Sequence, residues 1–299
     1  MRNKLIDSPF INVFLFSFFW AIQLFVGKLA FNAGAKAIPF TLQAAFISLI
    51  TLTIIVLPRK FKEVKSLPKN ILVGLLLANA IHFGVGGFFS NAGLALTTAI
   101  NAGFLGKFSL ITTTFLAWLL LKENMTFSKF VAVITMLIGS FLIITKGNLI
   151  VPHIGDLLII LACTSWSIGN VLIRKVLKNN HVSGDTVSFL RPVAGIPILL
   201  MFVALSSLYP VSIKNIFAVN LVDFHYFPFV IASGVLTSLL WIFLNRTLKV
   251  ASVSYMTMMS MITPVILSIL ALLFLKETMM PIQILGAALI IFSGVALII

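Results

Sequence analysis

The sequence predicts an all-α integral membrane protein with ten transmembrane helices arranged as two inverted five-helix repeats. Three observations predict this fold: an apolar composition, a succession of long apolar segments, and an internal repeat. Of the 299 residues, 60% are hydrophobic and only 9% are charged, whereas a soluble domain carries about 25% charged residues. So little polar surface cannot cover a water-soluble particle, and lipid must therefore form part of the solvent.

The apolar segments are long enough to cross a bilayer as helices, which takes about 20 residues. Ten segments approach this length, at roughly residues 10–31, 38–57, 71–92, 98–121, 127–146, 155–175, 187–208, 226–245, 250–275 and 281–298. Turn and charge clusters such as Pro58-Arg59-Lys60 separate them. The first segment exceeds the apolar core of a signal peptide, about 7–15 residues, so we expect it to be retained. The segments are apolar on all sides, unlike the alternating strands of a membrane barrel.

The chain is strongly basic, with a formal net charge of +14. We do not expect a nucleic-acid partner, because no basic helix or RNA-binding aromatic motif accompanies the charge. Cytoplasmic loops of membrane proteins are enriched in Lys and Arg. With a cytoplasmic N-terminus, fourteen basic residues fall on the cytoplasmic side and four on the other: Lys36, Lys146, Lys214 and Lys276. The sequence thus predicts a multi-pass protein of the cytoplasmic membrane with both termini in the cytoplasm.

The two halves of the chain align with each other. A shift of 154 residues places Asn91 on Asn245, and Leu121-Lys122-Glu123 on Leu275-Lys276-Glu277. Apolar matches arise by chance in such a composition, so the matched polar residues carry most of the weight. The end of the fourth segment therefore recurs at the end of the ninth.

The starts of the two halves match as well, at a shift of 146 residues. This shift places Trp20 on Trp166 and Lys28 on Arg174. The change of shift between the two blocks indicates longer connections in the second half.

The repeat divides the chain into residues 1–148 and 149–299. Because five helices is an odd number, the second unit must enter the membrane from the opposite side. Inverted repeats of this kind are typical of secondary transporters, whose substrate site lies between the repeats near the bilayer midplane. The sequence therefore predicts a transporter of a small molecule.

These features resemble the drug/metabolite transporter superfamily, in its EamA-type branch. In that family each repeat opens with a Trp-bearing helix, has an Arg in its second helix, ends its fourth helix in Leu-x-Glu and follows it with a Gly-containing helix. The matching residues here are Trp20 and Trp166, Arg191, Leu121-Lys122-Glu123 and Leu275-Lys276-Glu277, and Gly139, Gly286 and Gly294. The first half departs from the pattern, with Gln43 near the place of the Arg. The resemblance covers the whole chain and implies transport of metabolites, often amino acids or related compounds and often outward.

Lys107 is the foremost substrate-binding candidate. It lies about ten residues into its segment, and a charge at the bilayer centre costs about 2.5–3.5 kcal/mol on insertion scales, so such residues are functional candidates. It could bind an anionic group of a substrate, line a wet cavity as a structural charge, or be deprotonated. Asn101, on the same segment, is a further candidate.

His82 lies in a strip of small and polar residues that includes Asn91. Small residues allow helices to approach closely, so the strip either packs against a neighbouring helix or lines a cavity with His82 as a protonatable contact. Both interpretations remain open.

Trp20 and Trp166 lie about half-way along their segments. This position favours a cavity wall over an interfacial aromatic belt. Further candidates of the same kind are Asn170, Tyr255 and Trp241.

Two other cations are expected to be structural. We expect Lys28 to reach the membrane interface, and Arg191 either to do so or to pair with Asp185.

The acidic residues all fall at segment ends or in loops. A carboxylate proton relay is therefore not expected, which leaves facilitated diffusion, exchange or coupling through His82. The sequence has no catalytic signature, nucleotide-binding loop or metal-binding cluster, so we expect neither an enzyme nor a cofactor. The partners expected are a small-molecule substrate and the lipid bilayer, in a monomer or a homodimer. Export of drugs or other hydrophobic or cationic compounds is the alternative, ahead of an intramembrane enzyme or a channel.

Overall fold

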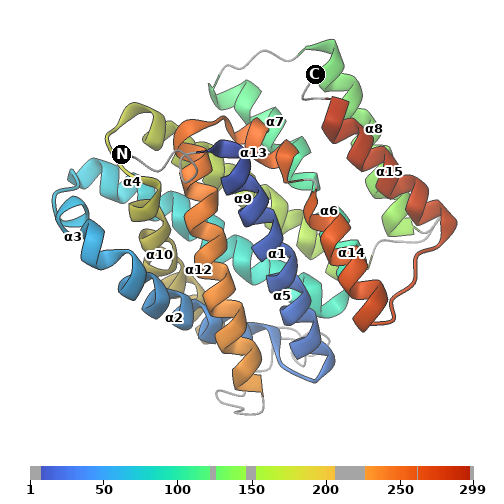
Figure 1. Ribbon diagram of the computed structural model, residues 1–299, viewed down its shortest axis with the longest axis horizontal. Coiled ribbons are helices and arrows are strands. Elements are labelled where there is room, and N and C mark those ends of the chain that lie inside the picture. Colours follow the sequence, from blue (N-terminus) through green and yellow to red (C-terminus); the bar gives the residue numbers. More distant parts are fainter. Residues whose placement is uncertain (1–7, 122–125, 146–152, 206–225, 261, 297–299) are drawn as a thin grey trace.

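The computed structural model describes residues 8–121, 126–145, 153–205, 226–260 and 262–296, and all regular secondary structure in these ranges is helical. Within these ranges, seven helical stretches are long and apolar enough to cross a membrane, and three shorter apolar helices accompany them. They form one bundle (Figure 1). The chain is therefore built as a multi-pass membrane protein, and ten membrane crossings remain a prediction.

The predicted apolar segments coincide with helices or with runs of consecutive helices. In chain order the helices are α1 Pro9–Asn32, α2 Ala37–Ile55, α3 Leu57–Lys65, α4 Lys69–Asn79, η1 Ala80–Val85, α5 Gly86–Leu96, α6 Ala99–Leu105, α7 Phe108–Leu121, α8 Phe127–Thr145, α9 Ile154–Asn179, α10 Gly184–Ala204, α12 Phe227–Val250, α13 Val253–Met259, α14 Ile262–Phe274 and α15 Pro281–Ala296.

Three of the predicted segments are interrupted. The third contains the π-helix η1 between α4 and α5, a form that often occurs at functional sites. The fourth breaks between α6 and α7 at Gly106 and Lys107, and the ninth breaks after α13, at Ser260. The bounds of α6 and α13 differ by 154 residues, which is the shift of the internal repeat. The two breaks thus occupy corresponding positions in the two halves.

One helix was not predicted. The cluster Pro58-Arg59-Lys60 was expected to be a turn, but it lies in the short basic helix α3. Pro58 is in the first helical turn, where its missing N–H costs no hydrogen bond.

The closest helix pairs join the first half of the chain to the second. Helix α1 packs along α12, α5 along α9, and α8 along α15. Glycines allow the last of these crossings, because a Cβ atom on Gly139 would lie 2.7 Å from the Gly286 carbonyl oxygen, and one on Gly286 would lie 2.6 Å from that of Gly139. Small residues bring membrane helices together in this way.

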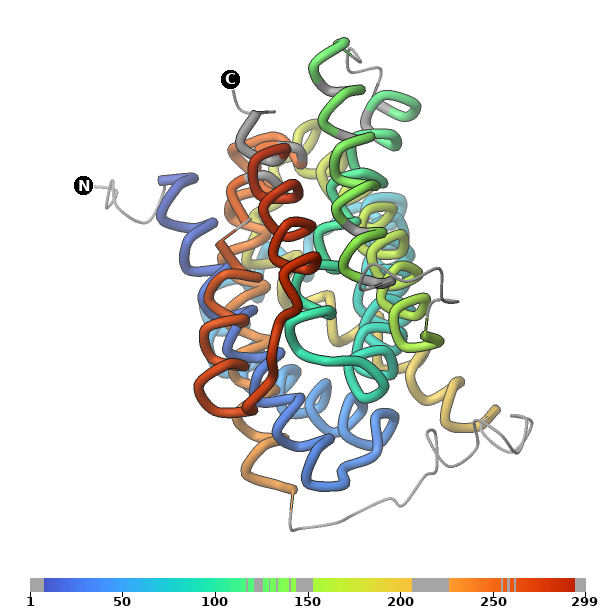
Figure 2. The backbone as a smooth tube through the Cα atoms, turned by 90° about the vertical axis from the view of Figure 1, so that its right-hand side faces the viewer, coloured from blue at the N-terminus to red at the C-terminus, as the bar shows by residue number. Residues whose placement is uncertain are grey.

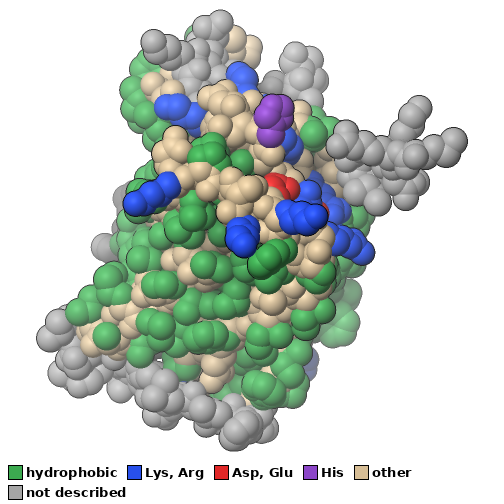
Figure 3. Space-filling view, turned by 90° about the vertical axis from the view of Figure 1, so that its left-hand side faces the viewer, with side chains coloured by type: hydrophobic (Ala, Val, Ile, Leu, Met, Phe, Trp, Pro, Cys, Tyr) green, Lys and Arg blue, Asp and Glu red, His purple; other side chains and the backbone are tan. Residues whose placement is uncertain are grey.

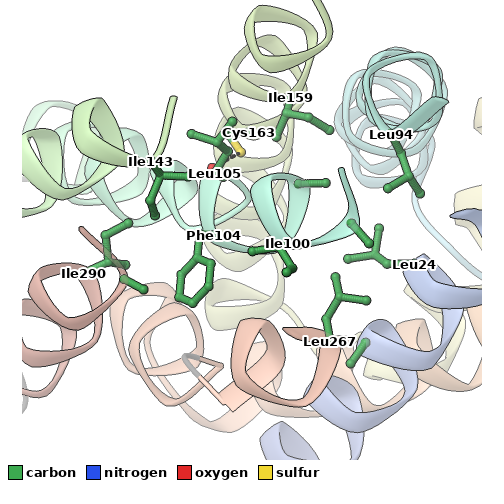
Figure 4. Close-up of a cluster of buried hydrophobic side chains, with 14 of the residues drawn as sticks. Leu24, Leu94, Ile100, Phe104, Leu105, Ile143, Ile159, Cys163, Leu267 and Ile290 are labelled. Carbon is green, nitrogen blue, oxygen red and sulfur yellow. Dashed lines mark hydrogen bonds between the residues drawn. The ribbon is translucent and has the colours of Figure 1, made fainter. Parts of the chain in front are cut away.

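The short helix α6 lies in the middle of the main apolar core (Figure 4). Its Ile100 and Phe104 pack with residues of α1, α8, α9, α14 and α15, including Leu24, Ile143 and Leu267. This core therefore contains side chains from both halves of the chain.

The outside of the bundle is apolar, as lipid contact requires. Figure 3 shows a broad hydrophobic face with Lys and Arg gathered in a band near one end. Figure 2 shows that the start of α1 and the end of α15 lie at the same end of the bundle. This arrangement agrees with an even number of crossings.

Candidate functional site

Two cavities lie inside the bundle. The first cavity, with an empty volume of about 550 Å³, has a mostly apolar wall in which polar side chains are supplied by Gln23, Thr41, Ser90, Asn91, Ser233 and Thr237. The second cavity, of about 420 Å³, is bordered by Phe16, Ser109, Thr113, Asn170, Leu244, Met256 and Ser260. The first extends towards the end of α1 and the start of α2, and the second towards the start of α1 and the end of α12. The cavities therefore lie towards opposite ends of the bundle.

Four ring side chains line both cavities, and we call them the aromatic partition: Trp20, His82, Trp166 and Trp241. The rings of Trp20 and Trp166 meet edge to face with centroids 5.5 Å apart, and those of His82 and Trp241 do so at 5.0 Å. Edge-to-face contacts are a favoured geometry for aromatic rings. Each half of the chain contributes two of the four rings, so the partition stands between the halves.

Two glycines make room for rings of the partition, because a side chain at either position would collide with a ring residue. A Cβ atom on Gly169 of α9 would lie 2.4 Å from the Cβ of His82. One on Gly86 would lie 2.5 Å from the Trp166 ring. The close approach of η1, α5 and α9 thus requires glycine at both positions, which is why a polar, glycine-rich strip surrounds His82 in the sequence.

Lys107 lies at the break between α6 and α7 and is 2% exposed. Its ammonium donates to the Ser260 carbonyl oxygen at 2.6 Å and to the Ser260 hydroxyl at 3.1 Å, and it lies 4.6 Å from the Trp20 ring centroid. The side chain therefore joins the broken helix of the first half to the broken helix of the second. Lys107 does not itself line either cavity.

Arg191 of α10 is fully buried, which corrects the expectation that it reaches the interface or pairs with Asp185. Asp185 instead forms two hydrogen bonds with Arg246, at 2.7 and 3.0 Å. The Nη2 of Arg191 donates to Asn245 Oδ1 at 2.8 Å and makes a longer contact of 3.4 Å with Asn170 Oδ1. Its guanidinium stacks on Trp241, 4.5 Å from the ring centroid. Arg191 is thus one layer behind the partition.

Several polar atoms around Trp241 have no hydrogen-bond partner among the described residues. They are the Nδ1 of His82, the Nε1 of Trp241, and the Nε and Nη1 of Arg191. Buried polar atoms are nearly always paired, so each exception calls for an explanation. This corner of the site therefore has hydrogen-bonding capacity that the fold itself does not use.

The structure assembles most of the predicted site but not all of it. Trp20, His82, Trp166, Trp241, Asn91 and Asn170 line the cavities. Asn101 instead accepts a hydrogen bond from Gln283 at 3.1 Å, and Tyr255 packs beside a core cluster, so neither lines a cavity. Lys28, expected at the interface, is buried and donates to the Leu94 and Thr97 carbonyls.

Sequence reasoning missed the hydroxyl groups of the site. Ser167 accepts a hydrogen bond from Thr113 at 2.9 Å and lies 2.6 Å from the Thr112 hydroxyl. Ser260 was missed as the partner of Lys107, although the repeat shift aligns it with Gly106 at the other break. That alignment was the available signal, but serine alone is too common in helices to be recognised.

The chain is similar to a bacterial protein that is named as a transporter. Over 172 residues it is 26% identical to the uncharacterized transporter YyaM of Bacillus subtilis (strain 168), a match that covers 56% of this chain and 55% of the relative. The matched part thus spans about half the length of that relative. One solved crystal structure shares the fold: the match covers 99% of this chain and 96% of that chain, at 16% identity and with a TM-score of 0.65.

A family match covers almost the whole chain. The EamA-like transporter family matches residues 8–145 and again residues 153–299. Together with the apolar helices, this double match assigns the chain to a family of membrane transporters: the protein belongs to the EamA-like transporter family.

Proposed function

We propose that this protein is a secondary transporter that moves a small organic metabolite, an amino acid or a related compound, across the cytoplasmic membrane by alternating access. The observation that carries the proposal is the aromatic partition, which separates two cavities that extend towards opposite ends of the bundle. A substrate held at the partition would meet one cavity and then the other as the two halves rearrange.

The corresponding helix breaks support two inverted repeats. In transporters with such repeats, interrupted helices at matching positions surround the substrate site. Here the breaks at Lys107 and Ser260 are joined by hydrogen bonds beside the second cavity. A second correspondence is that Lys28 donates to the Leu94 carbonyl, and its repeat counterpart Arg174 donates to the Leu248 carbonyl, the counterpart of Leu94.

The charges near the partition favour a substrate with an anionic group. Lys107 and Arg191 both stack on tryptophans of the partition, and neither forms an ion pair in the part of the chain that the structure describes. A carboxylate is attracted to this positive potential because charges interact strongly where water is excluded. Zwitterions such as amino acids meet this requirement, and export is the direction we propose.

A third hollow favours a second candidate function, the export of hydrophobic compounds. An apolar groove of about 940 Å³ lies between α7, α8 and α9, bordered by Ile111, Thr112, Phe115, Leu116, Phe130, Thr164 and Ile168. Thr112 borders this groove, Thr113 borders the second cavity, and both contact the Ser167 hydroxyl. These hydroxyl side chains link the wall of the groove to the wall of the cavity, and we propose this place as the entry of a lipid-soluble compound.

The experiment is uptake by the purified protein in liposomes, with and without a pH gradient. Amino acids, organic acids, nucleosides and cationic drugs are each tested. We expect saturable uptake of a carboxylate-bearing compound. Uptake of hydrophobic cations alone would favour the second candidate, and no uptake of any compound by folded protein would contradict the transport proposal.

A further inference from the structure

Helix α3 has two chemically different faces at one end of the bundle. Its outward face carries exposed Phe61, Lys62 and Lys65. Lys65 follows Lys62 by three residues and Phe61 by four, so the three side chains lie on one side of the helix. Its inward face carries Glu63, whose carboxylate accepts a hydrogen bond from the Ser183 backbone N–H at 2.6 Å. Because Ser183 caps the start of α10, this bond ties α3 to the second half of the chain.

The outward face has an excess of unpaired positive charge. Among the described residues, Glu63 pairs with Lys60 at 3.1 Å. The exposed cations Arg59, Lys62 and Lys65 make no ion pair in that part of the chain. Three neighbouring cations thus present their charge outward from one short helix.

The position of α3 places these cations at the edge of the apolar surface. Helix α2 ends at Ile55 with lipid-facing side chains, since Ile54 is 69% exposed, and α3 starts two residues later. Figure 1 shows α3 beside α2 at one side of the bundle, and the side view in Figure 3 shows a Lys and Arg band bordering the hydrophobic surface. Phe61 is 57% exposed on the same face. A large apolar side chain between lysines is the pattern of a helix that lies in the headgroup layer.

We propose that the outward face of α3 binds anionic phospholipid headgroups, with Phe61 inserted among the upper acyl chains. Basic residues beside a transmembrane helix attract anionic lipid by about 1 kcal/mol each. Lys62 and Lys65 face the lipid surface directly, and Arg59 flanks them. The Glu63 bond holds the helix in place, so the cations are presented by a fixed scaffold and not by a flexible loop. Zwitterionic phosphatidylcholine carries no net charge and is not selected.

The test uses a single fluorescent probe on α3. Cys163 is the only cysteine of the sequence and is buried. Cys163→Ser removes this thiol. Ser66→Cys then places a single thiol at the exposed end of α3 without changing the charge. The labelled protein is reconstituted in phosphatidylcholine vesicles that contain a minority of phosphatidylglycerol. In the first sample the phosphatidylglycerol carries bromine, which quenches the probe on contact. In the second sample the phosphatidylcholine carries the bromine. We expect phosphatidylglycerol to quench more strongly per mole, with roughly fivefold local enrichment for each engaged cation.

Matched double variants test whether the selection belongs to α3. Lys62→Gln with Lys65→Gln should reduce the enrichment severalfold. Lys175→Gln with Lys178→Gln removes the same charge from another exposed Lys pair with the same spacing, on α9, and should leave it unchanged. Lys62→Arg with Lys65→Arg keeps the charge and should retain the enrichment, which controls for misfolding. Equal quenching by both lipids in the unsubstituted α3, or equal losses in the two Gln variants, would overturn the proposal.

Discussion

The two buried cations Lys107 and Arg191 differ in how far the fold uses their hydrogen-bonding groups. Both are at most 2% exposed, and each stacks on a tryptophan of the aromatic partition. The ammonium of Lys107 donates twice to Ser260, whereas two of the three guanidinium nitrogens of Arg191 have no partner among the described residues.

This difference shows that burial of a charge in a membrane bundle does not by itself identify a substrate anchor. Judged only by its position in the middle of an apolar segment, Lys107 is the stronger candidate for a substrate anchor. Its contacts, however, are those of a structural link between two broken helices. Like Lys107, Arg191 lines neither cavity, but it retains donors for an additional acceptor. We therefore expect substitutions of Arg191 to act mainly on substrate binding, and substitutions of Lys107 mainly on stability.

The largest expected effect follows from Arg191→Gln. Hydrogen bonds to charged groups contribute about 1.5–3 kcal/mol each, so loss of the guanidinium should lower kcat/KM about 10- to 100-fold. Arg191→Lys keeps the charge but not the planar donor geometry, so its kcat/KM should lie between those of the unsubstituted protein and Arg191→Gln. Liposome uptake at matched protein amounts measures this effect. Normal uptake by Arg191→Gln would remove Arg191 from the site.

Lys107→Met should lower thermal stability more than it changes KM. The variant removes both hydrogen bonds from the Lys107 ammonium to Ser260, and hydrogen bonds to charged groups contribute about 1.5–3 kcal/mol each. Thermal unfolding in detergent, followed beside KM in liposomes, separates the two effects. A rise in KM equal to that of Arg191→Gln would contradict the structural role and restore Lys107 as an anchor.

Substitutions of the two stacked tryptophans should also separate into an effect on substrate binding and an effect on stability, and both effects should be smaller than those of the cation substitutions. A desolvated cation–π contact contributes about 2 kcal/mol. Trp241→Leu should therefore raise KM, because it removes the ring on which Arg191 stacks. Trp20→Leu should mainly lower the unfolding temperature, because it removes the ring on which Lys107 stacks. Trp241→Phe and Trp20→Phe keep a ring and serve as controls. Identical profiles for the two Leu variants would show that the tryptophans act as one unit.

The smallest effect is expected at Glu63, a titratable group outside the membrane-spanning helices. Burial tends to raise the pKa of its carboxyl, but hydrogen bonds from the Ser183 N–H, the Thr186 and Ser183 hydroxyls and Lys60 outweigh burial and lower the pKa below its usual 4.5. Its contribution to stability is therefore complete above the unfolded pKa and is lost as the pH falls through the lower folded pKa. As the pH is lowered from neutral to acidic, the unfolding temperature should fall less for Glu63→Gln than for the unsubstituted protein. Parallel pH profiles would show that the Glu63 tether contributes nothing.

Much of the fold was predictable because it depends on local composition. The apolar segments, the family resemblance and the mid-segment Trp20 and Trp166 all follow from runs and repeats that are properties of the chain itself. The helix in Pro58-Arg59-Lys60 was missed because charge and proline are typical of turns, yet the segment forms an amphipathic helix at the edge of the bundle.

What the sequence by itself determined is that this chain needs lipid as its solvent, repeats itself, and carries aromatic and basic side chains in the middle of its apolar segments. Only the tertiary structure decided which partner each polar group has. Lys107 meets Ser260 across 153 residues of chain, and Asp185 meets Arg246 in place of Arg191. The physical reason is that hydrophobicity acts through the composition of a segment, whereas a hydrogen bond requires two particular atoms within about 3 Å, and that distance is set by helix packing.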